Sequence, residues 1–308
     1  MSWFTRKGRS QEELSRLFRE LVEGPDILVL PGTPDALAAR LAQEQGFPAL
    51  YLSGAAYTAS RALPDLGLVT AEEVAQRARD IVRATDLPLL VDIDTGYGGV
   101  LHAMATARIM VEARVAAVHM EDQVMPKKCG HLSGKELVSP EEMAQKIAAL
   151  KEAAPSLYLI ARTDAFAVEG LEGALGRARL YLEAGADAIF PEALTTEDDF
   201  RAFRKGLAAP LLANMTEFGK TPLTSAQTFA SWGYEMVIFP VSALRMAARA
   251  YEDTYRELKE KGTQKDLLPR MQTRVQLYET IQYFEYEALD QKIARTIPET
   301  SWESQKEG

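Results

Sequence analysis

The chain contains very little cysteine and histidine: one cysteine, Cys129, and three histidines in 308 residues. A single cysteine cannot form a disulfide within the chain, so a disulfide-stabilised secreted fold is excluded. The three histidines lack zinc-site spacing, and there is no Ser/His/Asp hydrolase signature or GxxxxGK[ST] phosphate-binding loop. These absences turn attention to carboxylates, arginines and the one thiol.

Long apolar runs and an excess of positive charge are also missing. No run approaches the ~20 residues of a membrane helix, and the first twenty residues carry charge instead of an apolar signal core. The net charge of -9 argues against a general nucleic-acid-binding surface, which requires a basic face. We therefore expect a cytoplasmic protein that binds neither nucleic acid nor membranes.

The sequence does contain a regular alternation of short apolar runs and longer amphipathic stretches. Its hydrophobic content of 47% is ordinary for a globular protein and supplies a sizeable core. Helical patterns are expected at 10–23, 70–83, 102–112, 139–153, 171–184 and 196–205. Strands are expected at 27–30, 49–53, 89–92, 116–121, 157–162, 188–191, 211–214 and 236–239.

Eight apolar runs separated by helices indicate parallel strands that are buried on both faces. Such a pattern fits a closed (β/α)8 TIM barrel or a large doubly wound sheet. Polar residues end or follow most of the runs, which favours the barrel, because barrel enzymes place their chemistry at the carboxyl ends of the strands. They are Ser53, Asp92, Glu121, Arg162, Glu192 and Asn214.

We expect one domain, 1–308, of the α/β class, with an N-terminal helix before the barrel. The helical region 241–295 exceeds what the barrel needs. We expect this surplus to pack on another subunit of an oligomer.

Asp92 and Asp94 lie two positions apart, so they share one face of a strand. Their carboxylates suit a hard cation such as Mg2+, or alternatively Mn2+. His119 and Glu121 share a strand face in the same way, and Glu121 could contact the same cation. The alternatives are a solvated turn for the aspartates and a core position for His119.

The only cysteine follows two lysines, Lys127 and Lys128, and precedes His131. These cationic neighbours should lower the pKa of the Cys129 thiol, so that it exchanges a proton near neutral pH. The surrounding stretch, 122–138, is long enough for a lid. The alternative is an incidental surface thiol in a basic loop.

Several dispersed residues could bind an anionic substrate. Arginine binds a carboxylate through two parallel hydrogen bonds. If Arg162, Arg245 and Arg274 converge, they imply a substrate with more than one carboxylate. The alternative for each arginine is an ordinary salt bridge.

Taken together with the short sequence strings given at the end of this paragraph, these residues resemble the isocitrate lyase/phosphoenolpyruvate mutase superfamily over roughly residues 28–295. The Lys127–His131 string favours the lyase branch over the phosphonate mutases. The strings that carry the resemblance include Tyr51-Leu52-Ser53-Gly54, Leu63-Pro64-Asp65-Leu66-Gly67, Asp92-Ile93-Asp94, Glu121-Asp122-Gln123, Ala161-Arg162-Thr163-Asp164-Ala165, Asn214-Met215-Thr216-Glu217-Phe218-Gly219 and Met271-Gln272-Thr273-Arg274.

The resemblance implies a Mg2+-dependent homotetramer that exchanges helices between subunits. It implies cleavage of a tricarboxylate, 2-methylisocitrate, to pyruvate and succinate in propionate breakdown. Cys129 would protonate the succinate half, with Lys127 and His131 beside it. The implied metal positions are Asp92 and Asp94, with Asp65, His119 and Glu121 in the shell. The implied substrate positions are Ser53, Gly54, Ala55, Cys129, Gly130, Arg162, Glu192, Asn214, Met215, Thr216, Arg245 and Arg274.

Two alternatives stay open. The same scaffold could act on isocitrate, 2,3-dimethylmalate or a phosphonate, and Phe190 and the Phe239-Pro240 pair could shape a pocket for the extra methyl group. The second alternative is a barrel protein that binds ligands without turning them over, and such a protein would need no Mg2+.

Overall fold

The computed structural model of the protein describes residues 3–127 and 134–296. The chain divides into two compact units. The first is Arg9–Tyr255, and the second combines the chain before Arg9 with the chain from Arg256 onward.

Eight parallel strands form the centre of the first unit, and all eight expected strands are confirmed. They bond in two groups, in the orders β1-β8-β7 and β2-β3-β4-β5-β6. Isolated parallel bridges, Gly32 to Tyr51 and Ile189 to Leu211, join the two groups at both seams, so the strands follow one another around a barrel. The strands are β1 (Leu28–Pro31), β2 (Leu50–Leu52), β3 (Leu89–Asp92), β4 (Ala117–Glu121), β5 (Tyr158–Thr163), β6 (Ala188–Pro191), β7 (Leu212–Asn214) and β8 (Met236–Phe239).

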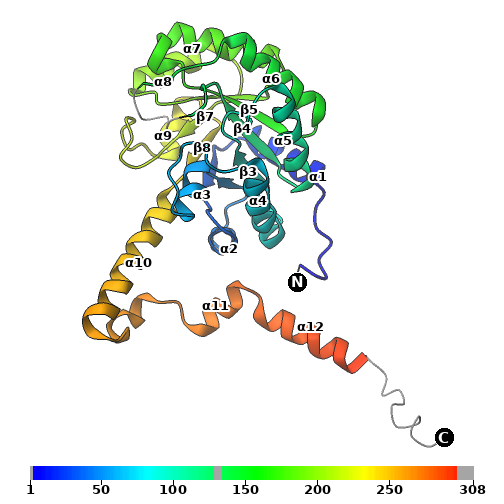
Figure 1. The fold of residues 1–308 in the computed structure, drawn as a ribbon, viewed down its shortest axis with the longest axis vertical. Helices are drawn as coiled ribbons and strands as arrows, with labels where there is room; N and C mark the ends of the chain where they lie inside the picture. The colour runs from blue at the N-terminus through cyan, green and yellow to red at the C-terminus, as the bar shows by residue number, and fades with distance from the viewer. Residues whose placement is uncertain (1–2, 128–133, 297–308) are drawn as a thin grey trace, which may run out of the picture. The chain divides into compact units, whose positions relative to one another are not determined.

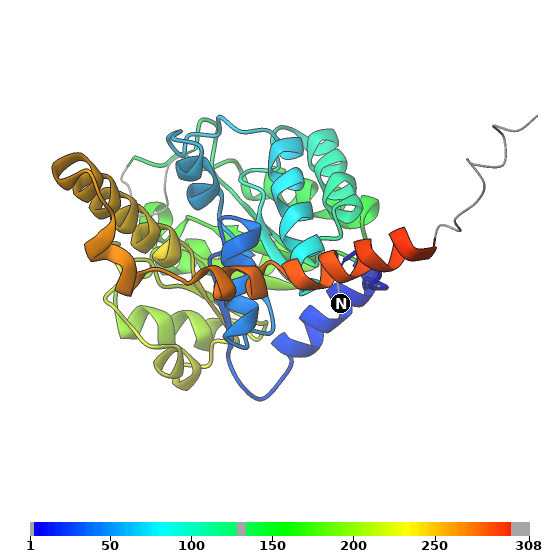
Figure 2. The same cartoon turned by 90° about the horizontal axis from the view of Figure 1, so that it is seen from below.

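Helices cover the outside of these strands (Figure 1), as the view from below also shows (Figure 2). Neighbours along the chain pack on one another, such as α5 on α6 and α6 on α7. The helices of the first unit are α1 (Gln11–Val22), α2 (Ala36–Glu44), α3 (Gly54–Ser60), α4 (Ala71–Thr85), α5 (Val100–Glu112), α6 (Pro140–Ala153), α7 (Phe166–Glu183), α8 (Glu197–Gly206) and α9 (Ala226–Ser231).

Local sequence signals set where these helices begin. Ser10 and Glu13 form a capping box at the start of α1, each side chain bonding to the other's backbone N–H. Ser139 caps α6 by accepting from the backbone N–H of Glu142, with Pro140 at the first helical position. Each cap satisfies backbone donors that the helix itself leaves unpaired.

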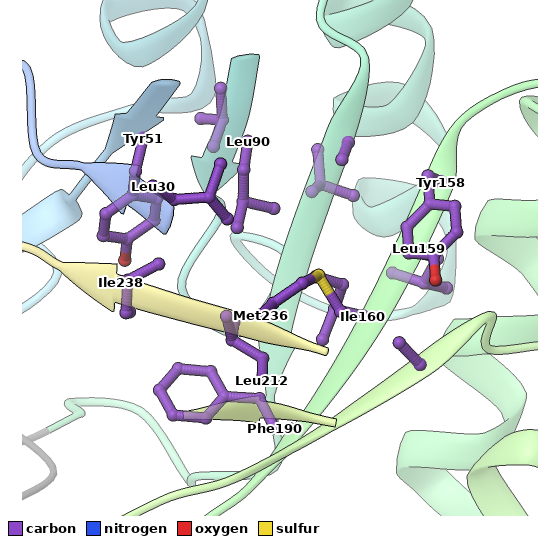
Figure 3. Close-up of a cluster of buried hydrophobic side chains, with 14 of the residues drawn as sticks. Leu30, Tyr51, Leu90, Tyr158, Leu159, Ile160, Phe190, Leu212, Met236 and Ile238 are labelled. Carbon is purple, nitrogen blue, oxygen red and sulfur yellow. The ribbon is translucent and has the colours of Figure 1, made fainter. Parts of the chain in front are cut away.

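Apolar side chains from several strands fill the interior. Leu30, Leu90, Ile160 and Met236 are fully buried, and Figure 3 shows them gathered among the strands together with Leu212. Burying one such side chain contributes about 1.5–3 kcal/mol. This packing makes the strand ends a rigid base for the polar residues that follow.

The second unit is helical. It contains the end of α10 (Ser242–Lys261), a 3-10 turn at Lys265–Arg270, α11 (Arg274–Thr280) and α12 (Tyr283–Thr296).

None of the residues of α10 is buried, although Met246, Tyr251 and Tyr255 are large apolar or aromatic side chains. Within the described ranges, no helix is both long enough and apolar enough to cross a membrane.

Candidate active site

The polar residues at the strand ends continue the inward-facing rows of the core. Alternate residues of a strand face the same side, so a polar residue two positions after an inward apolar one also points inward. The pairs are Leu90 with Asp92, Ile160 with Arg162, Phe190 with Glu192, and Leu212 with Asn214. The barrel therefore brings these four polar side chains to one mouth.

A cavity of about 130 Å³ opens at this mouth. The structure brings eleven predicted site residues to its wall: Ser53, Ala55, Asp65, Asp92, Glu121, Lys127, Arg162, Glu192, Asn214, Thr216 and Arg245. The other lining residues are Tyr51, Phe190, Ile238, Pro240 and Val241.

The ammonium of Lys127 lies between two of the predicted metal-shell carboxylates. Its Nζ atom is 2.5 Å from Asp65 Oδ1 and 2.7 Å from Asp94 Oδ1, and its side chain is 3% exposed. Burial raises the pKa of Asp94 to about 6 against the opposing effect of Lys127, and the charge of Asp92 adds to the rise. Asp65 and Lys127 line the cavity, whereas Asp94 does not but contacts Lys127. This acidic corner thus concentrates negative charge around one cation.

Asp92 is held by backbone donors on both of its oxygen atoms. Oδ1 accepts from the N–H of Asp94 at 3.0 Å, and Oδ2 accepts from the N–H of Gly54 at 3.2 Å. A Cβ atom at Gly54 would lie 3.0 Å from Asp92 Oδ2, so glycine permits this close approach. Gly54 therefore contacts the acidic corner through its backbone.

His119 lies behind the cavity wall, fully buried. Its Nε2 atom is 2.8 Å from the Tyr51 hydroxyl, and its Nδ1 atom is 3.7 Å from Asp92 Oδ1. Burial lowers the pKa of His119 to about 4, so the ring is neutral near pH 7. A neutral imidazole can support Asp92 and Tyr51 without adding charge.

Arg162 forms the basic side of the cavity. Its Nη1 atom is 3.0 Å from Glu121 Oε2, while Nε and Nη2 donate to the two oxygens of Asp164 at 3.0 and 3.2 Å. Phe190 lies under the guanidinium, with the ring centroid 5.3 Å from its carbon. Burial raises the pKa of Glu121, although Arg162 opposes this shift.

Two further contacts shape the remaining wall. Asn214 donates through its amide to both oxygens of Glu192, at 3.4 and 3.3 Å. Arg245 approaches Glu217 at 3.7 Å and is half exposed. Of these four side chains, all but Glu217 line the cavity.

The donor set of the acidic corner fits Mg2+. Asp65, Asp92 and Asp94 offer carboxylate oxygens, the hard ligands that this ion prefers, and the Lys127 ammonium already shows that a cation is stable among them. Within residues 3–127 and 134–296, no three His, Cys, Asp or Glu side chains converge closely enough to hold an ion by themselves. Mg2+ usually takes only one or two carboxylates and completes its shell with water and substrate oxygens.

The structure does not bring every predicted residue to the cavity. Met215 is buried beside it and donates its backbone N–H to Ile238. Arg274 begins α11, which belongs to the second unit. Cys129, Gly130 and His131 lie outside the described residues.

The sequence matches proteins of one family over most of its length. Residues 18–259 match the family model of phosphoenolpyruvate phosphomutase. The 2-methylisocitrate lyase of Bacillus subtilis (strain 168) is 62% identical over 297 residues, which cover 96% of this chain and 99% of the relative. The 2-methylisocitrate lyase of Escherichia coli (strain K12) is 44% identical over 286 residues, which cover 91% and 97%.

Solved structures show the same fold. A 2,3-dimethylmalate lyase, described as a PEP mutase/isocitrate lyase superfamily member, superposes with a TM-score of 0.86 at 34% identity, covering 92% of this chain and 96% of the other. A phosphonopyruvate hydrolase in complex with oxalate and Mg++ superposes with a TM-score of 0.81 at 27% identity, covering 92% and 98%.

Proposed function

Since the chain belongs to the phosphoenolpyruvate phosphomutase family, within the PEP mutase/isocitrate lyase superfamily, we propose that it cleaves 2-methylisocitrate to pyruvate and succinate. The single observation that carries this proposal is the 62% identity to a 2-methylisocitrate lyase over 96% of the chain. The cavity supports it, because both carboxylates and the guanidinium of Arg162 line it.

The cavity walls suit a small tricarboxylate. Arg162 and Arg245 offer guanidinium groups for substrate carboxylates. Asn214 and Thr216 offer uncharged donors from the same mouth, while Phe190 presents an apolar surface. We assign these side chains to binding and orienting the substrate, along with Ser53 and Glu192.

The acidic corner is where Mg2+ would bind, on Asp92 and Asp94, with Asp65 and Glu121 in the surrounding shell. A bound Mg2+ supplies positive charge to the oxygens of the substrate's 2-oxo-acid half. Asp92 is already oriented for this task by the backbone N–H groups of Gly54 and Asp94.

The cleavage itself is a retro-aldol reaction. The hydroxyl of the substrate loses its proton, the adjacent C–C bond breaks, and the hydroxyl carbon becomes the ketone of pyruvate. The electron pair of the broken bond passes to the other half, which forms the aci-carboxylate of succinate. We propose that Cys129 protonates the carbon of the succinate half at which the C–C bond broke. Lys127 and His131, its neighbours in the sequence, would assist the thiol.

The identity of the released oxo-acid tests the substrate. Purified protein with Mg2+ is offered 2-methylisocitrate and isocitrate separately, and pyruvate or glyoxylate is measured. We expect pyruvate from 2-methylisocitrate at the higher kcat/KM. Glyoxylate from isocitrate at equal or better kcat/KM would overturn the assignment, and the absence of any turnover would favour a binding protein.

A cysteine substitution tests the proposed proton donor. We expect Cys129→Ser to abolish cleavage, because a serine hydroxyl is a much weaker acid than a thiol, while Mg2+ affinity measured by calorimetry stays unchanged. Substantial turnover by this variant would contradict the role of Cys129.

We also propose that the protein works in the cytoplasm as a homotetramer whose C-terminal helices are exchanged between subunits. The support is the amphipathic helix α10, none of whose residues is buried in the single chain. Its Met246 and Tyr255 side chains are 72% and 67% exposed. Exposed apolar surface of this kind marks a protein contact.

A further inference from the structure

A row of alternating charges runs from the cavity wall into the protein. It begins with Glu121 and Arg162 at the cavity, continues with Asp164 and includes Lys135. Lys135 Nζ lies 2.6 Å from Asp164 Oδ1, the oxygen that also accepts from Arg162 Nη2. The side chain of Lys135 is 1% exposed and that of Asp164 is fully buried.

Lys135 does not line the cavity that contains Arg162. It lies near the end of the 122–138 stretch, where backbone hydrogen bonds pair the two ends of the stretch. The N–H of Val124 donates to the carbonyl of Glu136 at 2.8 Å, and the N–H of Val138 donates to the carbonyl of Asp122 at 3.0 Å. Lys135 contacts Asp164, and Asp164 contacts Arg162, so an effect of Lys135 on a ligand in the cavity can pass through these two residues.

The charges of Asp164 and Arg162 give a reason for a lysine beside Asp164. Arg162 contacts two carboxyl groups, Asp164 and Glu121, and the charges of Glu192 and Asp92 also act on it. Without a second cation, Asp164 would cancel the charge that Arg162 presents to the cavity. Lys135 adds one positive charge to the row whether Glu121 is ionised or not, and charge differences inside a buried site are poorly screened.

We propose that Lys135 is a positioning residue for Arg162: it neutralises Asp164, so that the guanidinium keeps its orientation and its positive charge for a substrate carboxylate. This inference rests on the proposed function, in which Arg162 binds the substrate. Asp164 is the connecting group, because its two oxygens orient Nε and Nη2 of Arg162 and leave Nη1 directed toward Glu121.

The chain offers a matched control. Lys146 on α6 is also buried, with a side chain that is 7% exposed, and it pairs at 3.5 Å with Glu142, which is half exposed. Neither residue lines the cavity. Lys146→Met therefore removes a buried lysine that has no connection to Arg162.

The experiment compares Lys135→Met, Lys135→Arg and Lys146→Met by steady-state kinetics and thermal melting. For Lys135→Met we expect KM for 2-methylisocitrate to rise about tenfold, within the range of about 5- to 150-fold that is typical of coupling between groups at a distance, while kcat changes less than about threefold. Lys135→Arg should restore KM to within about threefold. Lys146→Met should lower the melting temperature without changing KM.

A purely structural role for Lys135 would lower the melting temperature or the fraction of active enzyme but leave KM unchanged, and that result would overturn the proposal. Should Lys135→Met fail to fold, Lys135→Gln takes its place with the same expected rise in KM. A double-mutant cycle adds a second test, since in the Arg162→Lys background the Lys135 substitution should add little to KM. Full additivity would contradict action through Arg162.

Failure of the proposed function can be distinguished from failure of this inference. The dissociation constant of succinate, measured by calorimetry on the same variants, does not depend on turnover. If the unaltered protein releases no pyruvate but Lys135→Met still weakens succinate binding about tenfold, the reaction assignment fails and the role of Lys135 stands. Equal succinate affinity in both proteins would overturn the role of Lys135.

Discussion

The carboxylate of Asp92 is the single side chain on which the proposed Mg2+ site depends most. Two backbone N–H groups fix its oxygens at the acidic corner. We expect Asp92→Asn to weaken Mg2+ binding by at least about 10- to 100-fold, the range seen when groups that support a metal site are altered. Calorimetric titration with Mg2+ measures the change, with Asp198→Asn, on the exposed face of α8, as the control. Equal affinity in Asp92→Asn would remove Asp92 from the site.

His119 gives the metal-free protein a specific pH dependence. Burial lowers its pKa from 6.5 to about 4 in the folded state, so between these values the unfolded chain binds more protons. This contribution to stability is present above pH 6.5 and is lost as the pH falls toward 4. Asp94, whose pKa is raised to about 6, has the opposite effect.

The comparison of His119→Gln with the unaltered protein isolates the histidine, because both proteins retain Asp94. The substitution should destabilise the protein near pH 7. At pH 5 the loss in unfolding free energy should be smaller by about 2 kcal/mol. The reason is that pH 5 lies about 1.5 units below the unfolded pKa of 6.5, and each unit corresponds to about 1.4 kcal/mol. Urea unfolding with a chelator present, at pH 7 and pH 5, measures the difference. A loss that is the same at both values would show that His119 titrates normally.

The positions of single residues could be predicted from the sequence where strand periodicity applied. Asp92, Arg162, Glu192 and Asn214 could be placed at one mouth because each ends an apolar run and faces inward. Tyr51 and Ile238 were not predicted, because inside an apolar run nothing distinguishes a residue that reaches the cavity from one that fills the core. Lys135 was not predicted either, since its effect depends on a contact with Asp164 across 29 positions of the chain.

At the scale of elements, α7 contains a matched pair of glycines. Gly170 interrupts the helix with φ 73° and ψ -171°, whereas Gly176 has helical geometry, and a Cβ atom would meet nothing within 4 Å at either position. The two positions therefore differ in backbone conformation and not in available space.

We expect opposite signs from the same substitution at these two sites. Gly170→Ala should lower the free energy of unfolding by about 1–3 kcal/mol, because a Cβ atom disfavours this conformation. Gly176→Ala should raise it by roughly 0.5–1 kcal/mol, because alanine loses less entropy in a helix. Chemical denaturation of both variants checks the pair, and destabilisation by both would mean that packing, not backbone geometry, decides.

The elements themselves were largely predictable, because eight apolar runs bounded by turns leave few other assignments. The short helices α2, α3 and α9 were not assigned. The α3 segment, Gly54–Ser60, is made mostly of small residues and lacks an amphipathic pattern, and α9 has six residues. Such helices form because their N-caps and the barrel hold them, since helices this short are not stable alone.

At the scale of the whole molecule, the proposed tetramer predicts a mass four times the 34.0 kDa of one chain in sedimentation. Tyr255 is 67% exposed on α10, and Tyr255→Lys should shift the protein toward smaller species by placing charge in an apolar contact. Glu260→Lys, an exposed position on the same helix, is the control. Sedimentation of the unaltered protein as a monomer would contradict the proposal.

The proposed tetramer, together with the exposure of α10, would link catalysis to protein concentration. In the proposed tetramer, this helix, which has no buried side chain in the single chain, would draw much of its stability from contacts with partners. Its order and the assembly would then obey the same mass-action equilibrium. Arg245, in the first turn of α10, also forms part of the cavity wall. In a highly diluted assay the subunits would separate, the helix would fray, and substrate affinity would fall while the barrel stayed folded. Specific activity should therefore drop on dilution and recover on concentration.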